Sequence, residues 1–230
     1  MEMIVILTGA GISAESGLGT FRDEGGLWAR YAIEDVATPE AFARNPDLVH
    51  RFYNARRAQA AWARPNAAHF ALAQLEQQHK GRVLIVTQNV DDLHERAGSR
   101  NVVHMHGTLG GALCHDCGHR WPAPMTMRTH DPCPACTATQ TRPDVVWFGE
   151  VPMGMEVIDP ALSRADLFVA IGTSGEVYPA AAYAQHAARL GAHTVELNLA
   201  SASNARDFAE SHLGPATRIV PDWVRSVLAG

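Results

Sequence analysis

The chain has 230 residues, 47% of them hydrophobic, and 24 acidic against 19 basic side chains, for a formal net charge of −5. This size and composition are typical of a globular protein that buries a substantial core in one large or two small domains. The small acidic excess excludes nucleic acid or an anionic membrane as a partner bound through bulk charge, so neither is expected.

The first predicted element is a buried strand that begins at Val5 and ends in a glycine-rich turn. Gly9 allows the tight turn, Gly11 lets the backbone approach a pyrophosphate, and Ala14 takes the third small position of a dinucleotide-binding fingerprint. We expect free amides at the start of the following helix to hold the anion. The pattern alone is weakly specific, and a glycine-rich strand-to-helix turn without a ligand is the alternative.

A dehydrogenase needs an acidic residue about 20 residues after this fingerprint, at the end of a second strand. The corresponding stretch, Phe21 to Tyr31, has no strand pattern. Its glycines and aromatic residues suit either a flap over a bound ligand or a surface loop. The nucleotide is therefore expected to be held differently from a hydride-transfer cofactor.

A helical pattern follows from Pro39 to Trp62. Tyr53 and Arg56 lie three residues apart on it and so share a face, a pair that residue chemistry alone assigns to the surface. A second helix is expected from residue 67 to residue 75, with Asn66 as its N-cap.

Strands then alternate with helices, as in a doubly wound α/β sheet. We expect strands at 83–86, 101–105, 144–148, 166–171, 193–198 and 217–220, and a helix at 179–190. Polar or glycine turns follow at the carboxyl ends, where open parallel sheets bind their ligands. A hydrogen-bonded turn histidine is the simpler interpretation of His106, but its place at a strand's carboxyl end favours a functional role.

All four cysteines fall in two Cys-x-x-Cys pairs separated by fifteen residues: Cys114, Cys117, Cys133 and Cys136. In a reducing compartment this spacing predicts a zinc ribbon inserted between strands, rather than disulfides. Four thiolates complete a tetrahedral shell and leave no position for a substrate, so one structural zinc ion is expected. The neighbouring histidines are expected to be bystanders: His115, His119 and His130.

No apolar run approaches the roughly 20 residues that span a bilayer. Few residues precede the first strand, which leaves no room for a signal peptide. A cytoplasmic location is therefore expected.

Several motifs together resemble the sirtuin family over essentially the whole chain, in the small bacterial form. They are Gly9-Ala-Gly-Ile-Ser13, Ser16-Gly17, Phe21-Arg22, Thr87-Gln-Asn-Val-Asp91, His106-Gly107, the paired cysteines, Val146-Trp-Phe-Gly-Glu150 and Gly172-Thr-Ser174. Each motif is modest alone, but their order and spacing are specific. The resemblance implies a Rossmann-like doubly wound parallel sheet with a small inserted zinc-ribbon and helical domain.

One catalytic domain, residues 1–230, is implied by the resemblance. Its expected parts are a Rossmann-like NAD-binding part (1–22, 82–110 and 144–230), a flap and helical part (23–81) and a zinc-ribbon insertion (111–143).

The resemblance also implies an NAD-dependent protein lysine deacylase that consumes NAD as a co-substrate. The acyl oxygen of a modified lysine attacks the ribose, nicotinamide leaves, and the acyl group departs on ADP-ribose. Proteins carrying acylated lysines are the implied partners, and a monomer is expected.

By the same resemblance, His106 is the general base, and Asn89 and Asp91 complete the catalytic set. Phe21 and Arg22 belong to a flap that closes on the cleaved ring. The positions that match cofactor-binding residues are Gly9, Ala10, Gly11, Ile12, Ser13, Gly17, Thr20, Phe21, Arg22, Trp28, Gln88, Asn89, Val90, Asp91, Gly172, Thr173, Ser174, Asn198, Leu199, Ala200 and Ala216.

Two segments match the cleft that clamps an extended peptide by strand addition, a mode that reads backbone shape more than sequence. Their residues are Val146, Trp147, Phe148 and Gly149, and Glu176 with Val177. Tyr53 and Arg56 resemble the Tyr-x-x-Arg pair of sirtuins that accept acidic acyl groups such as succinyl, and Ala37 matches a small residue that leaves room for the longer chain. Deacetylation is expected alongside, because an acetyl group is smaller.

The chain departs from the family pattern at Ala200, where a glutamate often binds the adenosine ribose, which puts NAD affinity in doubt. Val90 replaces a more usual isoleucine, a change expected to matter little. ADP-ribosyl transfer to a protein and NAD sensing without catalysis are the alternative functions.

Overall fold

The computed structural model describes residues 1–19 and 31–230. Its main sheet has six parallel strands in the order β3-β2-β1-β7-β8-β9. The strands are β1 (Met3–Thr8), β2 (Arg82–Thr87), β3 (Val102–His104), β7 (Leu167–Ile171), β8 (His193–Asn198) and β9 (Glu210–Leu213). The strand order reverses between β1 and β7, and a ligand crevice forms at the carboxyl ends of such a pair.

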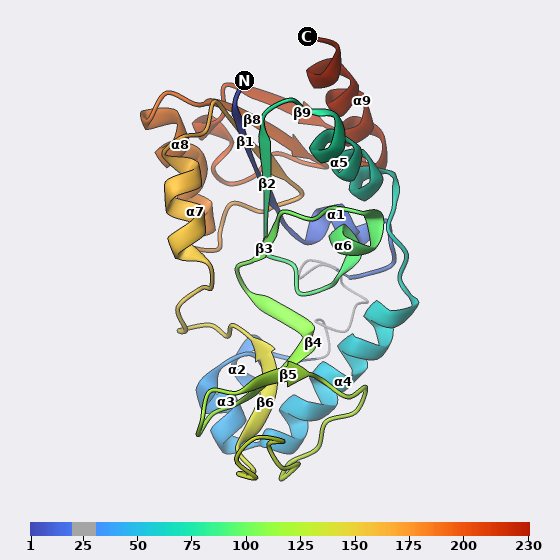
Figure 1. Cartoon of the computed structure of the whole chain (residues 1–230), viewed down its shortest axis with the longest axis vertical. Helices are drawn as coiled ribbons and strands as arrows, with labels where there is room; N and C mark the ends of the chain where they lie inside the picture. The colour runs from blue at the N-terminus through green and yellow to red at the C-terminus, as the bar shows by residue number, and fades with distance from the viewer. Residues whose placement is uncertain (20–30) are drawn as a thin grey trace.

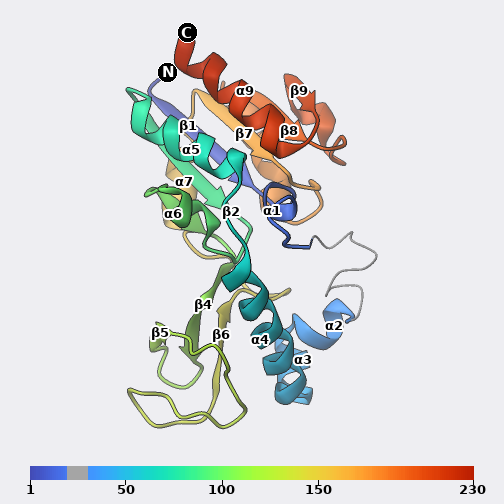
Figure 2. The same cartoon turned by 90° about the vertical axis from the view of Figure 1, so that its right-hand side faces the viewer.

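Helices cover both faces of this sheet, as Figures 1 and 2 show. They are α5 (Ala67–Gln78) and α9 (Ala216–Ala229) on one face, and α7 (Met155–Leu162) and α8 (Tyr183–Arg189) on the other. Because side chains alternate along a strand, Ile4 and Ile6 pack toward α5 and α9, whereas Val5 and Leu7 pack toward α7 and α8. Burial on both faces explains the continuous apolar run of the central strand.

A second, smaller lobe lies in the lower half of Figure 1. Its described residues form an antiparallel sheet in the order β5-β4-β6 and three helices. These are β4 (Gly107–Cys114), β5 (Arg120–Pro122), β6 (Thr141–Val145), α2 (Ile33–Val36), α3 (Pro39–Arg44) and α4 (Pro46–Trp62). Val49, Phe52, Tyr53 and Trp147 belong to one apolar cluster in this lobe, separate from the two clusters against the main sheet.

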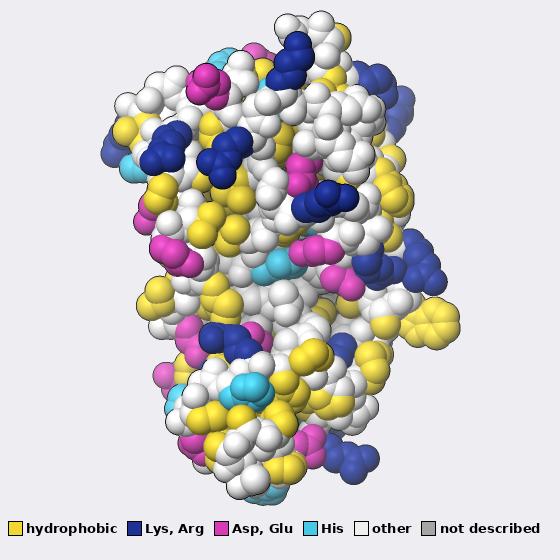
Figure 3. All heavy atoms as spheres, viewed as in Figure 1, with side chains coloured by type: hydrophobic (Ala, Val, Ile, Leu, Met, Phe, Trp, Pro, Cys, Tyr) yellow, Lys and Arg dark blue, Asp and Glu magenta, His cyan; other side chains and the backbone are white. Residues whose placement is uncertain are grey.

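Outside residues 20–30, the remaining elements are short helical segments: α1 (Ala10–Ala14), α6 (Leu93–Ala97), η2 (Ala180–Ala182) and η3 (Ala205–Asp207). No helix among residues 1–19 and 31–230 is both long and apolar enough to cross a membrane. On the face shown in Figure 3, acidic and basic side chains are interspersed.

The predicted fold class is confirmed, but three elements differ from prediction. Residues 217–220 are the first turns of α9, not a strand, because the helical period continues to the buried Trp223 and Val224. Residues 144–148 do not join the main sheet, since β6 pairs antiparallel with β4. The predicted helix from 39 to 62 is divided at Asn45, whose side chain caps α4.

The last strand of the main sheet is β9, which was not predicted. All four of its residues are exposed, so it carries no apolar alternation. The boundaries of the three parts of the domain stay a prediction.

Candidate active site

The loops after β1 and β7 touch at the centre of the main sheet, where only glycine fits. A Cβ on Gly9 would lie 2.7 Å from the Gly172 carbonyl oxygen, and one on Gly11 would lie 2.7 Å from Gly172 Cα. The Gly9 amide donates to Ile171 O at 2.9 Å, and the Gly11 amide donates to Gly172 O at 2.8 Å. The structure therefore gives these glycines a role in loop packing that the sequence did not indicate.

Two amides at the start of α1 are already bonded, so the prediction that they are free was wrong for them. Gly11 donates to Gly172, and the Ile12 amide donates to the Gly9 carbonyl at 3.2 Å. The cause is the close approach of the two loops. An anion at this edge needs other donors.

Three predicted site residues, one in α1 and two in the loop after β2, meet in one buried hydrogen-bond network. Asn89 Nδ2 lies 3.1 Å from Gly9 O and 3.2 Å from Ser13 Oγ. Ser13 Oγ donates to Asp91 Oδ2 at 3.1 Å. Burial raises the pKa of the Asp91 carboxyl, while hydrogen bonds from Leu93 and Ser13 oppose that rise. The network fixes the orientation of Asn89 and Asp91 relative to the glycine turn.

His69, on α5, extends this network, and the sequence did not indicate it. The Asn66 amide donates to His69 Nδ1 at 3.3 Å, so that nitrogen carries no proton. The other ring nitrogen, Nε2, then donates to Ser13 Oγ at 3.4 Å. Burial lowers the pKa of His69 to about 4, which keeps the ring neutral near pH 7. His69 therefore orients Ser13, whose single proton goes to Asp91.

His106 follows β3 and lies beside the loop after β2. Its Nδ1 is 3.0 Å from the Gln88 carbonyl oxygen, which only accepts hydrogen bonds. Nδ1 therefore carries the proton of the neutral ring, and Nε2 is left as the basic nitrogen. Burial lowers the pKa of His106, which favours the neutral form. Its carbonyl accepts from the Val146 amide at 2.9 Å, which places a predicted substrate segment next to this histidine.

The side chains after β2, β7 and β8 are joined on the predicted adenosine side. Gln88 Nε2 donates to Thr173 Oγ1 at 3.0 Å, and Asn198 Nδ2 donates to Thr173 O at 2.8 Å. Leu199 and Ala200 are exposed beyond Asn198. The strands thus bring these predicted residues to one edge of the sheet.

The remaining residues predicted to bind the cofactor lie at several separate places around the site. Ala216 begins α9, where Thr217 bonds to Glu15 at the end of α1. Gly17 has a positive φ of 83°, and its carbonyl accepts from Gln59 at 3.2 Å. Ala10 and Ser174 are half-buried, and Val90 is buried. Thr20, Phe21, Arg22 and Trp28 lie outside the described residues.

The residues predicted to accept an acidic acyl group gather in the smaller lobe. Tyr53 is only 1% exposed, so its interpretation as surface decoration was wrong. Arg56 Cζ lies 5.9 Å from the centre of the Tyr53 ring. The Ala37 carbonyl accepts from the Phe148 amide at 3.0 Å, and Trp147 Nε1 donates to Tyr53 Oη at 2.9 Å.

Two other predicted peptide-contacting positions lie on a separate loop. Glu176 is exposed and Val177 half-buried, just after Gly172–Ser174. Gly149 has a positive φ of 91° and is exposed. Whether these segments clamp a peptide stays a prediction.

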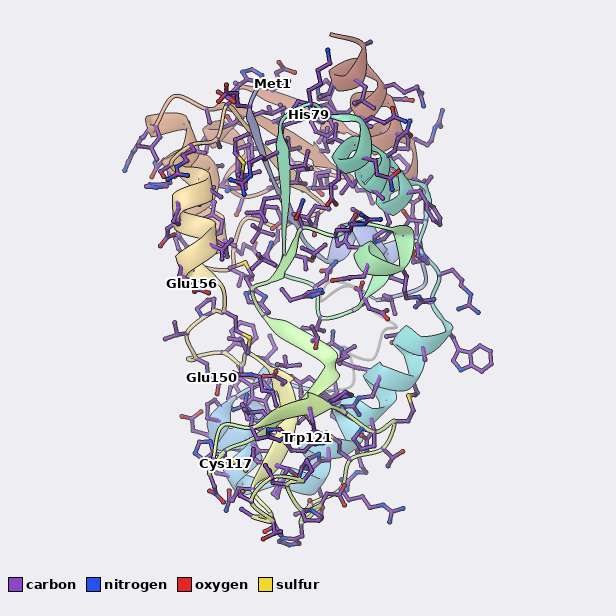
Figure 4. All side chains as sticks on the ribbon, viewed as in Figure 1. Met1, His79, Cys117, Trp121, Glu150 and Glu156 are labelled. Carbon is purple, nitrogen blue, oxygen red and sulfur yellow. The ribbon has the colours of Figure 1, made fainter. Side chains whose placement is uncertain are left out.

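The four cysteines of the smaller lobe fit a zinc ion. Their sulfur atoms all lie within 4.8 Å of one another. Cys114 and Cys136 Sγ are 3.7 Å apart, and Cys117 and Cys133 Sγ are 3.8 Å apart. A tetrahedral site with Zn–S bonds of about 2.3 Å needs sulfur separations of about 3.8 Å. The predicted structural zinc site is confirmed, and Figure 4 shows Cys117 in the lower lobe, away from the main sheet.

Comparison with known proteins gives consistent matches. The model of the Sir2 family matches residues 9–179. The chain is 55% identical over 230 residues to an NAD-dependent protein deacylase of Caulobacter vibrioides, covering 98% of this chain and 97% of that protein. It is 54% identical to an NAD-dependent protein deacylase of Salmonella typhimurium, covering 99% of this chain and 84% of that protein.

Solved structures of Sir2 proteins superpose on this chain over nearly its whole length. A Sir2 homologue in complex with NAD superposes with a TM-score of 0.89 at 40% identity, covering 98% of this chain and 89% of that one. A Sir2 protein with a deacetylated peptide and 3′-O-acetyl-ADP-ribose superposes with a TM-score of 0.82 at 29% identity, covering 99% and 92%.

Proposed function

The chain belongs to the Sir2 family and is an NAD-dependent protein deacylase, and on that premise we propose which residues carry the reaction and which acyl groups it removes. We assign the general base to His106, with Asn89 and Asp91 completing the catalytic set. The chain accepts succinyl as well as acetyl groups on lysine. The observation that carries the catalytic assignment is the Nδ1–H bond of His106 to Gln88, which leaves Nε2 basic.

NAD, the co-substrate, supplies a ribose whose bond to nicotinamide breaks as the acyl oxygen of the substrate lysine attacks the same carbon. His106 Nε2 then takes the proton of a ribose hydroxyl, so that this oxygen attacks the acyl carbon. The bond from that carbon to the lysine nitrogen breaks, the lysine amine leaves, and water completes the release of O-acyl-ADP-ribose. A neutral imidazole suits this step near pH 7. Its lowered pKa and its contact with the Val146 segment support this assignment.

Asn89 and Asp91 are assigned to the nicotinamide ribose and carboxamide. Their fixed orientation through Ser13 supports the assignment, since groups that position reactants gain most from a rigid setting. The loops that carry Gly172–Ser174 and Asn198 are assigned to the adenosine half. The missing acidic side chain at Ala200 is expected to weaken NAD binding rather than change the reaction.

The proposed succinyl activity depends on Tyr53 and Arg56. A guanidinium binds a carboxylate through two parallel hydrogen bonds, and a phenol hydroxyl adds a third. Arg56 lies over the Tyr53 ring, and both belong to α4. Ala37 is small, and its carbonyl accepts from the Phe148 amide, so it lies beside the predicted peptide segment.

The test is to mix the protein with NAD and either an acetyl-lysine or a succinyl-lysine peptide of the same sequence. Mass spectrometry should show nicotinamide, the deacylated peptide and the matching O-acyl-ADP-ribose in both reactions. Nicotinamide release without peptide deacylation would indicate ADP-ribosyl transfer to another acceptor. Binding of NAD without either product would indicate a sensing protein.

The protein's substrates are acylated proteins. We further assign it to the cytoplasm, as a monomer with no nucleic-acid or membrane partner. The four cysteines form no disulfide and are arranged to bind zinc, which supports a reducing compartment. The interspersed charges in Figure 3 support the absence of a polyanion partner. Sedimentation of the zinc-loaded protein tests the monomer.

A further inference from the structure

A hydrogen bond between two buried aromatic side chains determines where one hydroxyl proton can go. Trp147 Nε1 lies 2.9 Å from Tyr53 Oη, and the two side chains are 3% and 1% exposed. An indole N–H only donates, so the Tyr53 oxygen is the acceptor. The single proton of Tyr53 must therefore point elsewhere. Within residues 1–19 and 31–230 the structure shows no acceptor for it.

Trp147 is itself held in place on several sides. The Arg142 guanidinium carbon lies 3.4 Å from the centre of the indole ring. Arg142 binds both carboxylate oxygens of Glu150, at 2.6 and 2.9 Å, and donates to Val145 O at 2.7 Å. Glu150 also accepts from the Trp147 backbone amide at 2.7 Å. Figure 4 labels Glu150 near where the chain leaves the smaller lobe.

This clamp places a charged pair beside one indole ring. Arg142 is only 5% exposed and Glu150 is half-buried, and their bidentate contact is the geometry that best offsets the cost of burying the guanidinium. Phe42 packs on the same indole, with ring centres 5.3 Å apart. The direction of the Trp147 N–H is therefore fixed before any substrate binds.

Arg56 brings a second donor group to this part of the lobe. Its Cζ lies 5.9 Å from the Tyr53 ring centre, so the guanidinium packs over the ring that carries the hydroxyl. Burial raises the pKa of Tyr53, which keeps its hydroxyl protonated at neutral pH. A carboxylate matches both donors, whereas an acetyl group carries no acceptor beyond its carbonyl oxygen.

We propose that Trp147 is a positioning residue for acyl-group selection: its indole N–H occupies the Tyr53 oxygen, so that the Tyr53 proton is directed to an acyl carboxylate beside Arg56. The inference rests on the proposed succinyl activity and names the residue that sets this preference. Trp147 acts through Tyr53 and makes no contact with the carboxylate itself.

The experiment compares kcat/KM for succinyl and acetyl peptides of one sequence. Trp147→Phe removes the donor, and 3-benzothienylalanine inserted at position 147 removes it while keeping the ring size. Both changes should lower the succinyl-to-acetyl ratio by about fivefold, the order of one lost hydrogen bond. Trp62→Phe, the same change at an 82% exposed position, is the matched control and should leave the ratio unchanged.

A double-mutant cycle with Tyr53→Phe separates positioning from general damage. Once the hydroxyl is gone, Trp147→Phe should change the ratio by less than about twofold, because its effect passes through that hydroxyl. An equal loss for both peptides, or effects that multiply in the double variant, would overturn the inference. If Trp147→Phe fails to fold, the benzothienyl variant decides. A wild-type protein without succinyl activity would overturn the proposed function itself, and this is seen before any variant is made.

Discussion

His106 Nδ1 lies 3.0 Å from the carbonyl oxygen of Gln88, and this contact selects one tautomer of the ring. The selected form leaves Nε2 free of a proton. The same histidine is joined through its carbonyl to the Val146 amide, so one residue links the main sheet to the predicted peptide segment.

The deacylation rate should fall on the acidic side, with a midpoint below pH 6.5. Burial lowers the pKa of His106 from 6.5, and only the neutral ring is a base, so activity is present above that pKa and is lost as pH falls through it. The measurement is kcat/KM for an acetyl peptide between about pH 5 and pH 8. His106→Asn should lower the rate by about 10²- to 10⁴-fold and abolish the fall in rate at acidic pH. A midpoint above 6.5 would contradict the assignment.

Arg56→Met should reduce succinyl removal much more than acetyl removal. The substitution keeps an unbranched side chain but deletes the guanidinium, which makes charge-assisted hydrogen bonds. We expect the succinyl-to-acetyl ratio of kcat/KM to fall by at least about tenfold. Arg51→Met, at an exposed position of the same helix, is the matched control. An equal loss of both activities refutes the assigned role.

Much of the fold could be predicted because its signals are local. A short stretch of sequence is enough to recognise each of four features: strand β1, the glycine turn after it, the N-cap Asn66 and the cysteine spacing. Strand β9 has no such signal, since all its residues are exposed and its pairing depends on β8. The start of α9 was wrongly predicted as a strand, because four residues are too few to distinguish the helical repeat of apolar side chains from the alternation of a strand.

The connections within the site could not be predicted, because they join residues that are far apart in the chain. Trp147 and Tyr53 are separated by 94 positions, and Ser13 and His69 by 56. The spacing of residues in the sequence does not predict such contacts, because they depend on how the lobes and helices pack. Hence the resemblance to a family indicated Tyr53, Trp147 and Ser13, but neither the bond between Trp147 and Tyr53 nor the role of His69.

Removing zinc with a strong chelator should unfold the ribbon and stop deacylation. Without the metal, four thiolates held within 4.8 Å have no common partner, and structural zinc contributes directly to folding free energy. The effect reaches the site because β4 begins at Gly107, next to His106, and pairs with β6 at Val145. Metal content, circular dichroism and deacylation should be measured on the same sample, and zinc should restore activity when added back. Activity that persists in metal-free protein contradicts a structural ion.

The protein should lose stability between pH 6.5 and about pH 4 because His69 is buried in its neutral form. Its pKa is lowered from 6.5 to about 4 in the folded state, so the unfolded chain binds more protons in this window and unfolding is favoured as pH falls. At pH 5 the loss from His69 is about 2 kcal/mol relative to pH 7. His94, whose ring centre lies 5.0 Å from that of His69, has a pKa lowered to about 3 and adds to the loss.

His69→Gln isolates this effect, because an amide can accept from Asn66 and donate to Ser13 but does not titrate. Urea unfolding of the zinc-loaded protein at pH 7 and pH 5 should show a smaller pH-dependent loss in the variant, by about 2 kcal/mol. Titration of the cysteine site is common to both proteins and cancels in the comparison. His69 also helps to lower the pKa of His94, so the variant should lose less stability through His94 as well, which acts in the same direction. Equal losses would mean that folding does not lower the pKa of His69.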